Sequence, residues 1–181
     1  MKQEIRIIGG QYRGKKLHFP AVEGLRPTPD RVRETLFNWL MHDIRNARCL
    51  DAFAGSGALG LEAFSRGAKN VVFLEQSPQV HANLQKIILS FNNPTLQLLK
   101  MDARHYLQTN KEQFDIIFLD PPFSQNYLPQ CIGDIRQRNL LVQGGLLYLE
   151  SPTTIEIDEK YWQQLKQKQT GQVVYSLFTK L

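Results

Sequence analysis

The chain has 181 residues, 42% of them hydrophobic, which suits one domain with a sizeable core and is too few for two. Its formal net charge of +5 would attract a large acidic partner, nucleic acid above all. Cys49 and Cys131 are too few for a disulfide framework and lack metal-ligand spacing, and no apolar run is long enough to span a bilayer. We therefore expect a cytoplasmic monomer with no metal site and no membrane partner.

Residues 1–27 are predicted to form a basic hairpin that extends the main domain. Cationic side chains alternate with Ile5, Ile7 and Leu17 around Gly9-Gly10, a pattern typical of two short strands. The cations that we expect to contact phosphate groups are Arg6, Arg13, Lys15 and Lys16. Each of them is equally compatible with an ordinary solvated face.

A helix is predicted at the start of the main domain, which comprises residues 28–181. Thr28 is a suitable N-cap and Pro29 suits a first helical position. The apolar side chains that follow at helical spacing are Val32, Leu36, Trp39 and Leu40.

From Cys49 onward, short apolar runs alternate with helical patterns. Strands are predicted at 49–53, 71–75, 96–101, 116–120 and 146–150, and helices near 57–66, 78–91 and 127–138. Parallel neighbours need crossover connections, which are almost always helices, so this alternation predicts an α/β fold with a doubly wound, mostly parallel sheet.

The end of the chain departs from this alternation. Residues 161–168 and 172–180 are separated by Thr170-Gly171, which indicates a tight hairpin rather than another crossover. A Rossmann-like parallel sheet that ends in an antiparallel hairpin is typical of class I S-adenosylmethionine-dependent methyltransferases.

A glycine-rich turn follows the first strand of the main domain. Gly55-x-Gly57-x-x-Gly60 satisfies the dinucleotide-binding fingerprint, and Glu75 follows Gly55 by 20 residues, as a ribose-binding acid would. The pattern alone fits NAD, S-adenosylmethionine or a tight turn that binds no ligand. Asp51 favours S-adenosylmethionine, because a carboxylate here would repel a pyrophosphate and suit a sulfonium and an ammonium.

The predicted cofactor site lies at the ends of the first three strands of the main domain. Its residues are Asp51, Phe53, Ala54, Gly55, Gly57, Glu75, Gln76, Asp102 and Ala103. Glu75 would accept both ribose hydroxyls, and Asp102 and Ala103 would lie beside the adenine. Asp102 is equally suited to cap a helix.

The segment Asp120-Pro121-Pro122-Phe123 comes directly after a buried strand. Prolines stiffen the loop and bring carbonyls without N–H donors, so the loop presents hydrogen-bond acceptors. Acceptors suit an exocyclic base amine, which becomes acidic as it gains a methyl group. The Asp120 carboxylate and the Pro121 carbonyl are the predicted acceptors, and Phe123 would stack on a base swung out of its surroundings. An isolated Asp-Pro-Pro could simply end a strand, but here it accompanies a glycine-rich turn.

Several segments together resemble the RsmD family of bacterial 16S ribosomal RNA guanine-N2 methyltransferases. They are residues 6–17, 24–40, 51–63 and 120–123, continued by 171–173. The stretch from Arg26 to Glu34, Arg-Pro-Thr-Pro-Asp-Arg-Val-Arg-Glu, is the most specific of them.

The resemblance implies an enzyme that moves the methyl group of S-adenosylmethionine to the N2 amine of guanine 966 in 16S ribosomal RNA and leaves S-adenosylhomocysteine. The substrate would be the assembled or nearly assembled small ribosomal subunit, with the basic hairpin contacting its RNA. By the same resemblance, Arg26, Thr28 and Arg31 would touch the RNA or the cofactor at the entry to the site. The residues leave three other hypotheses open: an adenine-N6 DNA methyltransferase, a NAD-linked oxidoreductase and a non-catalytic RNA-binding assembly factor.

Overall fold

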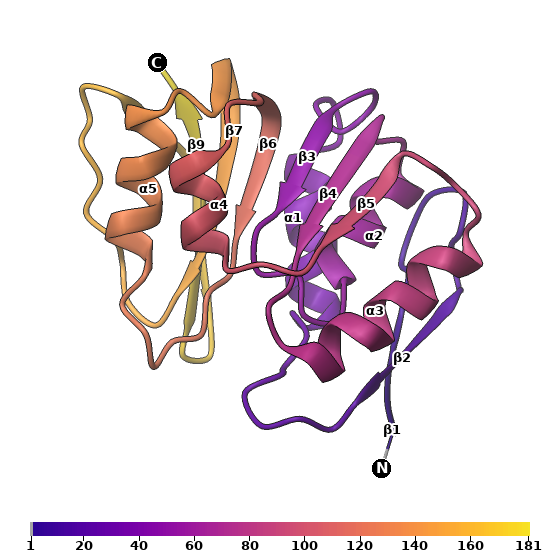
Figure 1. The fold of residues 1–181 in the computed structure, drawn as a ribbon. Helices are drawn as coiled ribbons and strands as arrows, with labels where there is room; N and C mark the ends of the chain where they lie inside the picture. Colours follow the sequence, from indigo (N-terminus) through magenta and orange to yellow (C-terminus); the bar gives the residue numbers. More distant parts are fainter. Residues whose placement is uncertain (1) are drawn as a thin grey trace.

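In a computed structural model, which describes residues 2–181, helices flank a seven-stranded sheet and a separate two-stranded hairpin lies beside them (Figure 1). In spatial order the strands of the large sheet are β5 (Leu96–Leu99), β4 (Asn70–Leu74), β3 (Arg48–Asp51), β6 (Phe114–Leu119), β7 (Leu141–Ser151), β9 (Val173–Lys180) and β8 (Trp162–Thr170). Strands β5 to β7 are parallel, whereas β9 is antiparallel to both of its neighbours. The predicted parallel sheet with a terminal hairpin is therefore confirmed.

The helices cover the two faces of the sheet. One face packs against α1 (Asp30–Trp39), α2 (Ala58–Ser65) and α3 (Pro78–Ser90), and the other against α4 (Ala103–Thr109) and α5 (Leu128–Gln137). Alternate residues of a strand point to opposite faces. In β6, accordingly, Ile116 and Phe118 belong to the first core and Ile117 and Leu119 to the second.

Helix α4 was missed by the sequence prediction. It has seven residues, too few for a clear 3.6-residue period. Ala103, Tyr106 and Leu107 are its buried residues, and Asp102 caps it by accepting a hydrogen bond from the Arg104 amide at 2.7 Å. The alternative reading of Asp102 as a helix cap was thus the signal that could have located this helix. None of the helices within residues 2–181 is long and apolar enough to cross a membrane.

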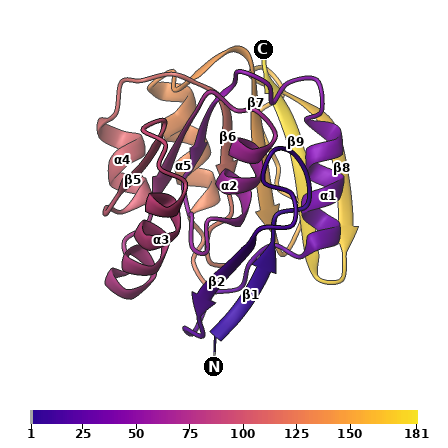
Figure 2. The same ribbon diagram turned by 90° about the vertical axis from the view of Figure 1, so that its right-hand side faces the viewer.

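The predicted N-terminal hairpin is formed by β1 (Lys2–Arg6) and β2 (Lys16–Pro20). Its apolar residues Ile5, Leu17 and Phe19 are buried in the core on the α1–α3 side of the sheet. The buried Glu62 carboxylate of α2 accepts hydrogen bonds from the amides of Ile8 and Gly9 just after β1. Figure 2 shows the hairpin strands below α2, extending beyond the edge at which the parallel strands end.

The segment between β2 and α1 runs along that same edge (Figure 1). The fully buried guanidinium of Arg33 holds it in place by donating to the carbonyls of Thr28 and Arg6. The prediction that Thr28 caps α1 is wrong: Pro29 occupies the N-cap position without a side-chain cap. The Thr28 hydroxyl is instead directed toward two carboxyl groups at the ends of β6 and β7.

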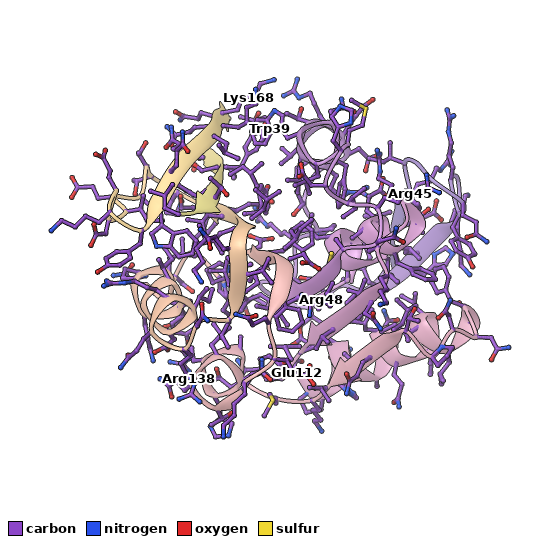
Figure 3. The ribbon with its side chains drawn as sticks, turned by 90° about the horizontal axis from the view of Figure 1, so that it is seen from above. Trp39, Arg45, Arg48, Glu112, Arg138 and Lys168 are labelled. Atoms are coloured by element: carbon purple, nitrogen blue, oxygen red, sulfur yellow. The ribbon has the colours of Figure 1, made fainter. Side chains whose placement is uncertain are left out.

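Figure 3 shows the opposite edge of the sheet, where the parallel strands begin and where Arg48, Glu112 and Arg138 lie. Trp39, at the end of α1, lies near Lys168 of β8 in the same view. Its ring stacks on that of Tyr175 in β9, with 5.4 Å between ring centroids, so α1 also packs on the terminal hairpin.

Candidate active site

Acidic side chains gather at the edge where the parallel strands end. The residues in question are Asp51, at the end of β3, and Glu75, Asp102, Asp120 and Glu150, at or just beyond the ends of β4, β5, β6 and β7. Because the carboxyl ends of parallel strands share one edge, the topology brings together acids that are far apart in the sequence. Four of the five were predicted site residues, and Glu150 was not.

The glycine-rich turn joins β3 to α2. Gly57 has a φ of +81° at the N-cap of α2, a conformation that favours glycine. A Cβ at Gly60 would lie 2.2 Å from Cε1 of Phe73, so glycine at this position allows α2 to pack closely on β4. The Gly60 amide donates to Oδ2 of the buried Asp51 at 2.9 Å. Asp51 therefore holds the turn through this hydrogen bond.

The Asp51 carboxyl has a strongly perturbed pKa. The pKa is raised to about 7: burial is the main cause, the Gly60 hydrogen bond opposes the rise, and the nearby charges of Glu75 and Glu150 add to it. A buried acid in this state favours the approach of a cation, since a positive neighbour would restore its charged form.

Glu75 also braces the glycine-rich turn. Its Oε2 accepts from the Gly55 amide at 3.0 Å and its Oε1 from the Ser77 amide at 2.9 Å. Each carboxylate oxygen has two lone pairs, so both can still accept a hydroxyl. Gln76 follows it and is exposed, and the half-buried Phe53 lies nearby in the turn.

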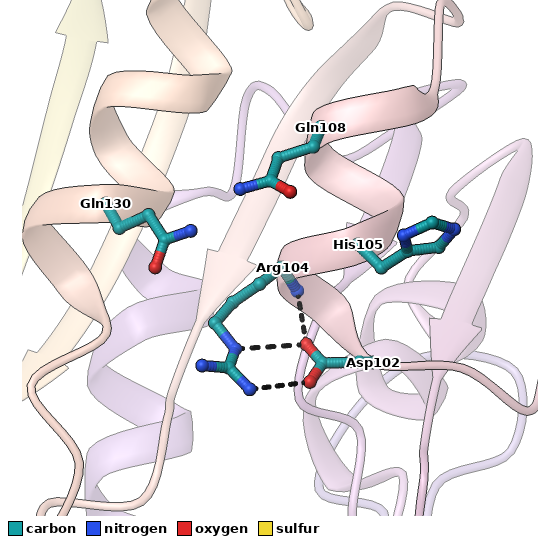
Figure 4. A pocket seen from close by; sticks show the side chains of 5 residues that line it. All are labelled: Asp102, Arg104, His105, Gln108 and Gln130. Carbon is teal, nitrogen blue, oxygen red and sulfur yellow. Dashed lines mark hydrogen bonds and ion pairs between the residues drawn. The ribbon is translucent and has the colours of Figure 1, made fainter.

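The predicted adenine end of the site opens into a cavity of about 260 Å³ lined by α4 and α5 (Figure 4). Asp102 faces Arg104 there, with 2.7 Å between Oδ2 and Nη2, and this pairing lowers the pKa of Asp102. The Arg104 guanidinium lies 4.1 Å from the centroid of the Tyr127 ring, which in turn stacks on Phe53 at 6.3 Å. Ala103, the first residue of α4, is buried. The Asp102 carboxylate is thus already paired with an arginine.

The Asp-Pro-Pro-Phe loop begins at the end of β6. Asp120 is half-buried and Pro121 is buried, whereas Pro122 is exposed and Phe123 is 44% exposed. An exposed aromatic ring next to an acid is the arrangement that stacking on a displaced base requires.

Asp120 lies beside two groups from other parts of the chain. The Thr28 hydroxyl oxygen is 3.3 Å from Asp120 Oδ2 and 2.9 Å from Glu150 Oε1, and the Tyr148 hydroxyl donates to Glu150 Oε1 at 2.7 Å. Burial raises the pKa of Asp120 well above its ordinary value, the charge of Glu150 raises it further, and the Thr28 hydroxyl opposes the rise. The carboxyl group thus lies at the end of β6 beside Thr28 and Glu150, which come from two other segments.

Glu150 and Tyr148 are functional candidates that the sequence reasoning missed. Both lie within the predicted strand 146–150, and Glu150 is its last residue. A carboxyl group at the end of an otherwise apolar strand was the available signal, because this strand ends at the same edge as β6.

Comparison with known proteins agrees with this geometry. The family model described as "Conserved hypothetical protein 95" matches residues 5–179. The Ribosomal RNA small subunit methyltransferase D of Haemophilus influenzae is 44% identical, over 98% of this chain and 94% of its own length. The chain belongs to the RsmD family.

Solved structures extend the similarity. The yhhF protein of Escherichia coli, described as a proposed methyltransferase, covers 98% of both chains with a TM-score of 0.89 and 40% identity. The 16S rRNA N2 G1207 methyltransferase of Thermus thermophilus, solved with AdoMet and guanosine, has a TM-score of 0.73 and 26% identity. This similarity covers 99% of the present chain and 50% of the Thermus chain. The predicted enzyme class, an S-adenosylmethionine-dependent methyltransferase with a class I fold, is confirmed.

The basic residues predicted to contact RNA differ in their surroundings in this RsmD family member. Arg6, Arg13, Arg26 and Arg31 are exposed. Lys15 is more constrained, since its Nζ donates to Ser90 and lies 4.0 Å from the centroid of the Phe91 ring. Lys16 pairs with Glu4 at 3.3 Å. Thr28, placed in the same predicted group, is buried and lies with Asp120.

Proposed function

We propose that this enzyme transfers a methyl group to the N2 amine of a guanine, guanine 966, in 16S ribosomal RNA of the small ribosomal subunit. The observation that carries the proposal is the position of Asp120, which lies at the edge shared with the glycine-rich turn, three residues before the exposed Phe123. The name of the Haemophilus relative and the N2 specificity of the Thermus enzyme support it.

The residues at this edge fit S-adenosylmethionine as the methyl donor. The Glu75 oxygens retain lone pairs for the ribose hydroxyls, and the buried Asp51 suits a cationic group. Phe53, Ala54, Gly55, Gly57 and Gln76 would line the same pocket, with Asp102 and Ala103 toward the adenine. When bound, S-adenosylmethionine supplies an electrophilic methyl group whose bonding electrons remain with sulfur in S-adenosylhomocysteine.

The loop after β6 would hold the target amine. The amine lone pair is delocalised into the base and is weakly nucleophilic, so acceptors at its two hydrogens favour a rehybridised nitrogen. The Asp120 carboxyl and the Pro121 carbonyl would supply those acceptors, and Phe123 would stack on the base. Holding the nitrogen in line with the methyl group contributes through orientation.

The test is to incubate the protein with labelled S-adenosylmethionine and small subunits that lack their own methylation, and then to map the modified nucleotide. We expect one labelled guanine, modified at N2. A matched reaction on DNA tests the main alternative. Labelled N6-methyladenine in that reaction would show that the enzyme methylates adenine in DNA. Binding of S-adenosylhomocysteine without binding of NAD would exclude the oxidoreductase.

The basic surface allows a second test of the proposed substrate. Arg13 is exposed and pairs with no acid among the described residues. Arg13→Ala should weaken subunit binding and reduce the slope of log affinity against log salt by about 1. Arg138, exposed at the opposite edge in Figure 3, provides a control of equal charge. Equal slopes for Arg13→Ala and Arg138→Ala would argue against phosphate contact by the hairpin.

A further inference from the structure

The contacts around Asp120 form a continuous chain of polar groups. From β7, the Tyr148 hydroxyl donates to Glu150 Oε1 at 2.7 Å; the Thr28 hydroxyl lies 2.9 Å from the same atom and 3.3 Å from Asp120 Oδ2. Tyr148 is 0% exposed, Thr28 4% and Glu150 5%. Groups this buried must satisfy one another, because water does not replace a missing partner.

This chain of polar groups contains too few hydroxyl hydrogens to satisfy two ionised carboxylates. A hydroxyl has a single hydrogen, so Thr28 cannot donate to Asp120 and Glu150 at once. If Thr28 donates to Glu150, its contact with Asp120 is a hydrogen bond only when Asp120 carries a proton and donates to the Thr28 oxygen. If Thr28 donates to Asp120, the proton belongs on Glu150. Either way, one proton on the carboxyl pair completes the chain.

We propose that Glu150 and Thr28 are positioning residues that act through Asp120, so that the two carboxyl groups together accept the proton released by the target amine. In the reactive state both carboxyl groups are ionised, so the chain of polar groups lacks one hydrogen. As the amine nitrogen gains its methyl group it loses one proton, which passes to a carboxyl oxygen of Asp120. Asp120 then gives that proton to the Thr28 oxygen while Thr28 passes its own hydrogen to Glu150, which leaves one proton on Glu150 and restores the Asp120 carboxylate. The inference rests on the proposed role of Asp120 as an acceptor for the amine.

The charged surroundings of Asp120 agree with a shared proton. Burial first and the Glu150 charge second raise the pKa of Asp120, and Asp51 of β3 acts in the same direction. Arg33 faces the backbone of Thr28, and its guanidinium is engaged by Asp30 and Glu62. Among the described residues, the surroundings that shift Asp120 thus comprise acids and hydroxyls. An acid kept weak in this manner is a better base near neutral pH.

The proposal is tested first without any cofactor. In apo protein with ¹³C-labelled carboxyl groups, the Asp120 signal, assigned by its loss in Asp120→Asn, should titrate well above an ordinary aspartate. In Glu150→Gln it should titrate lower by about one pH unit or more, because the neighbouring charge is gone. Glu34→Gln, which removes an exposed acid of α1, should leave it unchanged. An Asp120 titration that is the same in Glu150→Gln and wild type would overturn the inference.

Turnover provides the second readout. In Glu150→Gln, kcat should fall by about tenfold or more and the acidic limb of its pH profile should move to lower pH, with little change in KM for the methyl donor. Thr28→Val should reduce kcat and Thr28→Ser should restore it, because serine keeps the hydroxyl. A loss of kcat with an unmoved acidic limb would indicate a merely structural role and contradict the inference.

These outcomes separate this inference from the proposed function. If Asp120→Asn abolishes transfer while Glu150→Gln and Thr28→Val behave as wild type, the shared proton is wrong and the acceptor role of Asp120 stands. If Asp120→Asn itself turns over normally, the acceptor role fails. Should Glu150→Gln not fold, as judged by circular dichroism, the Thr28→Val and Thr28→Ser pair decides the question.

Discussion

Strand β6 has an aspartate near each end, and their surroundings shift the two pKa values in opposite directions. Asp115, near the beginning, accepts from the backbone amide of Arg48 at 2.7 Å and from its guanidinium at 3.1 Å. Burial opposes ionisation of Asp115, but the Arg48 contacts prevail and its pKa is lowered. Asp120, just past the end, has Glu150 and Thr28 as neighbours, and its pKa is raised well above the ordinary value. The ionised form of aspartate is therefore stabilised at one edge of the sheet, whereas at the other edge the carboxylate binds a proton more readily.

The difference between the two aspartates indicates which edge of the sheet carries functional acids. An acid that is charge-paired with arginine and bonded to a backbone amide stabilises the folded state, as at the start of β6. An acid placed among other acids costs stability in its charged form, and such a cost is typical of functional sites. Asp51 and Asp120, at the edge where the parallel strands end, are acids of the second kind, whereas Asp102 at the same edge is paired with Arg104.

The largest effect on turnover should come from substituting Asp120, with Asp115 substituted for comparison. Asp120→Asn should lower kcat by about 10²–10⁴-fold, the range for loss of an acid–base group, while affinity for S-adenosylhomocysteine stays near that of wild type. Asp115→Asn should leave turnover close to wild type, because Asp115 lies at the opposite edge. Single-turnover methyl transfer and calorimetric titration would measure the two quantities. Equal losses of kcat in the two variants would show that the two aspartates do not differ in their contribution to methyl transfer.

The next effect concerns Asp51, whose pKa is raised to about 7, chiefly by burial. A cationic cofactor would favour its charged form, so binding should release a proton and affinity should rise with pH up to about 7, by at most about tenfold per unit. Calorimetric titration of S-adenosylmethionine, in the absence of RNA, between pH 5.5 and pH 8 would measure this. Asp51→Asn keeps an oxygen for the Gly60 amide and should flatten the dependence; titration of the ligand itself affects both proteins equally. Identical pH dependence in both would remove Asp51 from the cofactor site.

Stability should respond to Asp51 in the direction opposite to the usual carboxylate. Its folded-state pKa lies above the unfolded value of about 3.9, so the folded state binds the extra proton between these values. Its contribution to the free energy of unfolding therefore decreases as pH rises from about 4 to about 7. The same Asp51→Asn protein, without ligand, should lack this component.

The sequence was sufficient to predict that Asp120 and Glu75 lie at strand ends, because each follows an apolar run. The spacing from Gly55 to Glu75 is also local enough to recognise. Thr28 and Glu150 are separated by 122 positions, so their contact depends on tertiary structure, which a single sequence does not display. Local rules also misplaced Thr28: its hydroxyl suits a helix cap, but in the fold it contacts the carboxyl groups of Asp120 and Glu150.

The smallest effect should be on the stability supplied by Asp115. The Asp115 and Arg48 side chains are 35% and 45% exposed, so solvent screens their attraction, and Asp115→Asn should lower the free energy of unfolding by only about 0.2–1 kcal/mol. Urea denaturation at pH 7 would measure this. Because the pKa of Asp115 is lowered on folding, its contribution is present above the unfolded value of about 3.9 and is lost as pH falls below it. The wild type and Asp115→Asn should therefore converge in stability in acid. A difference that persisted well below pH 3 would show that the charge pair is not its source, and the contrast between the two ends of β6 would then rest on Asp120 alone.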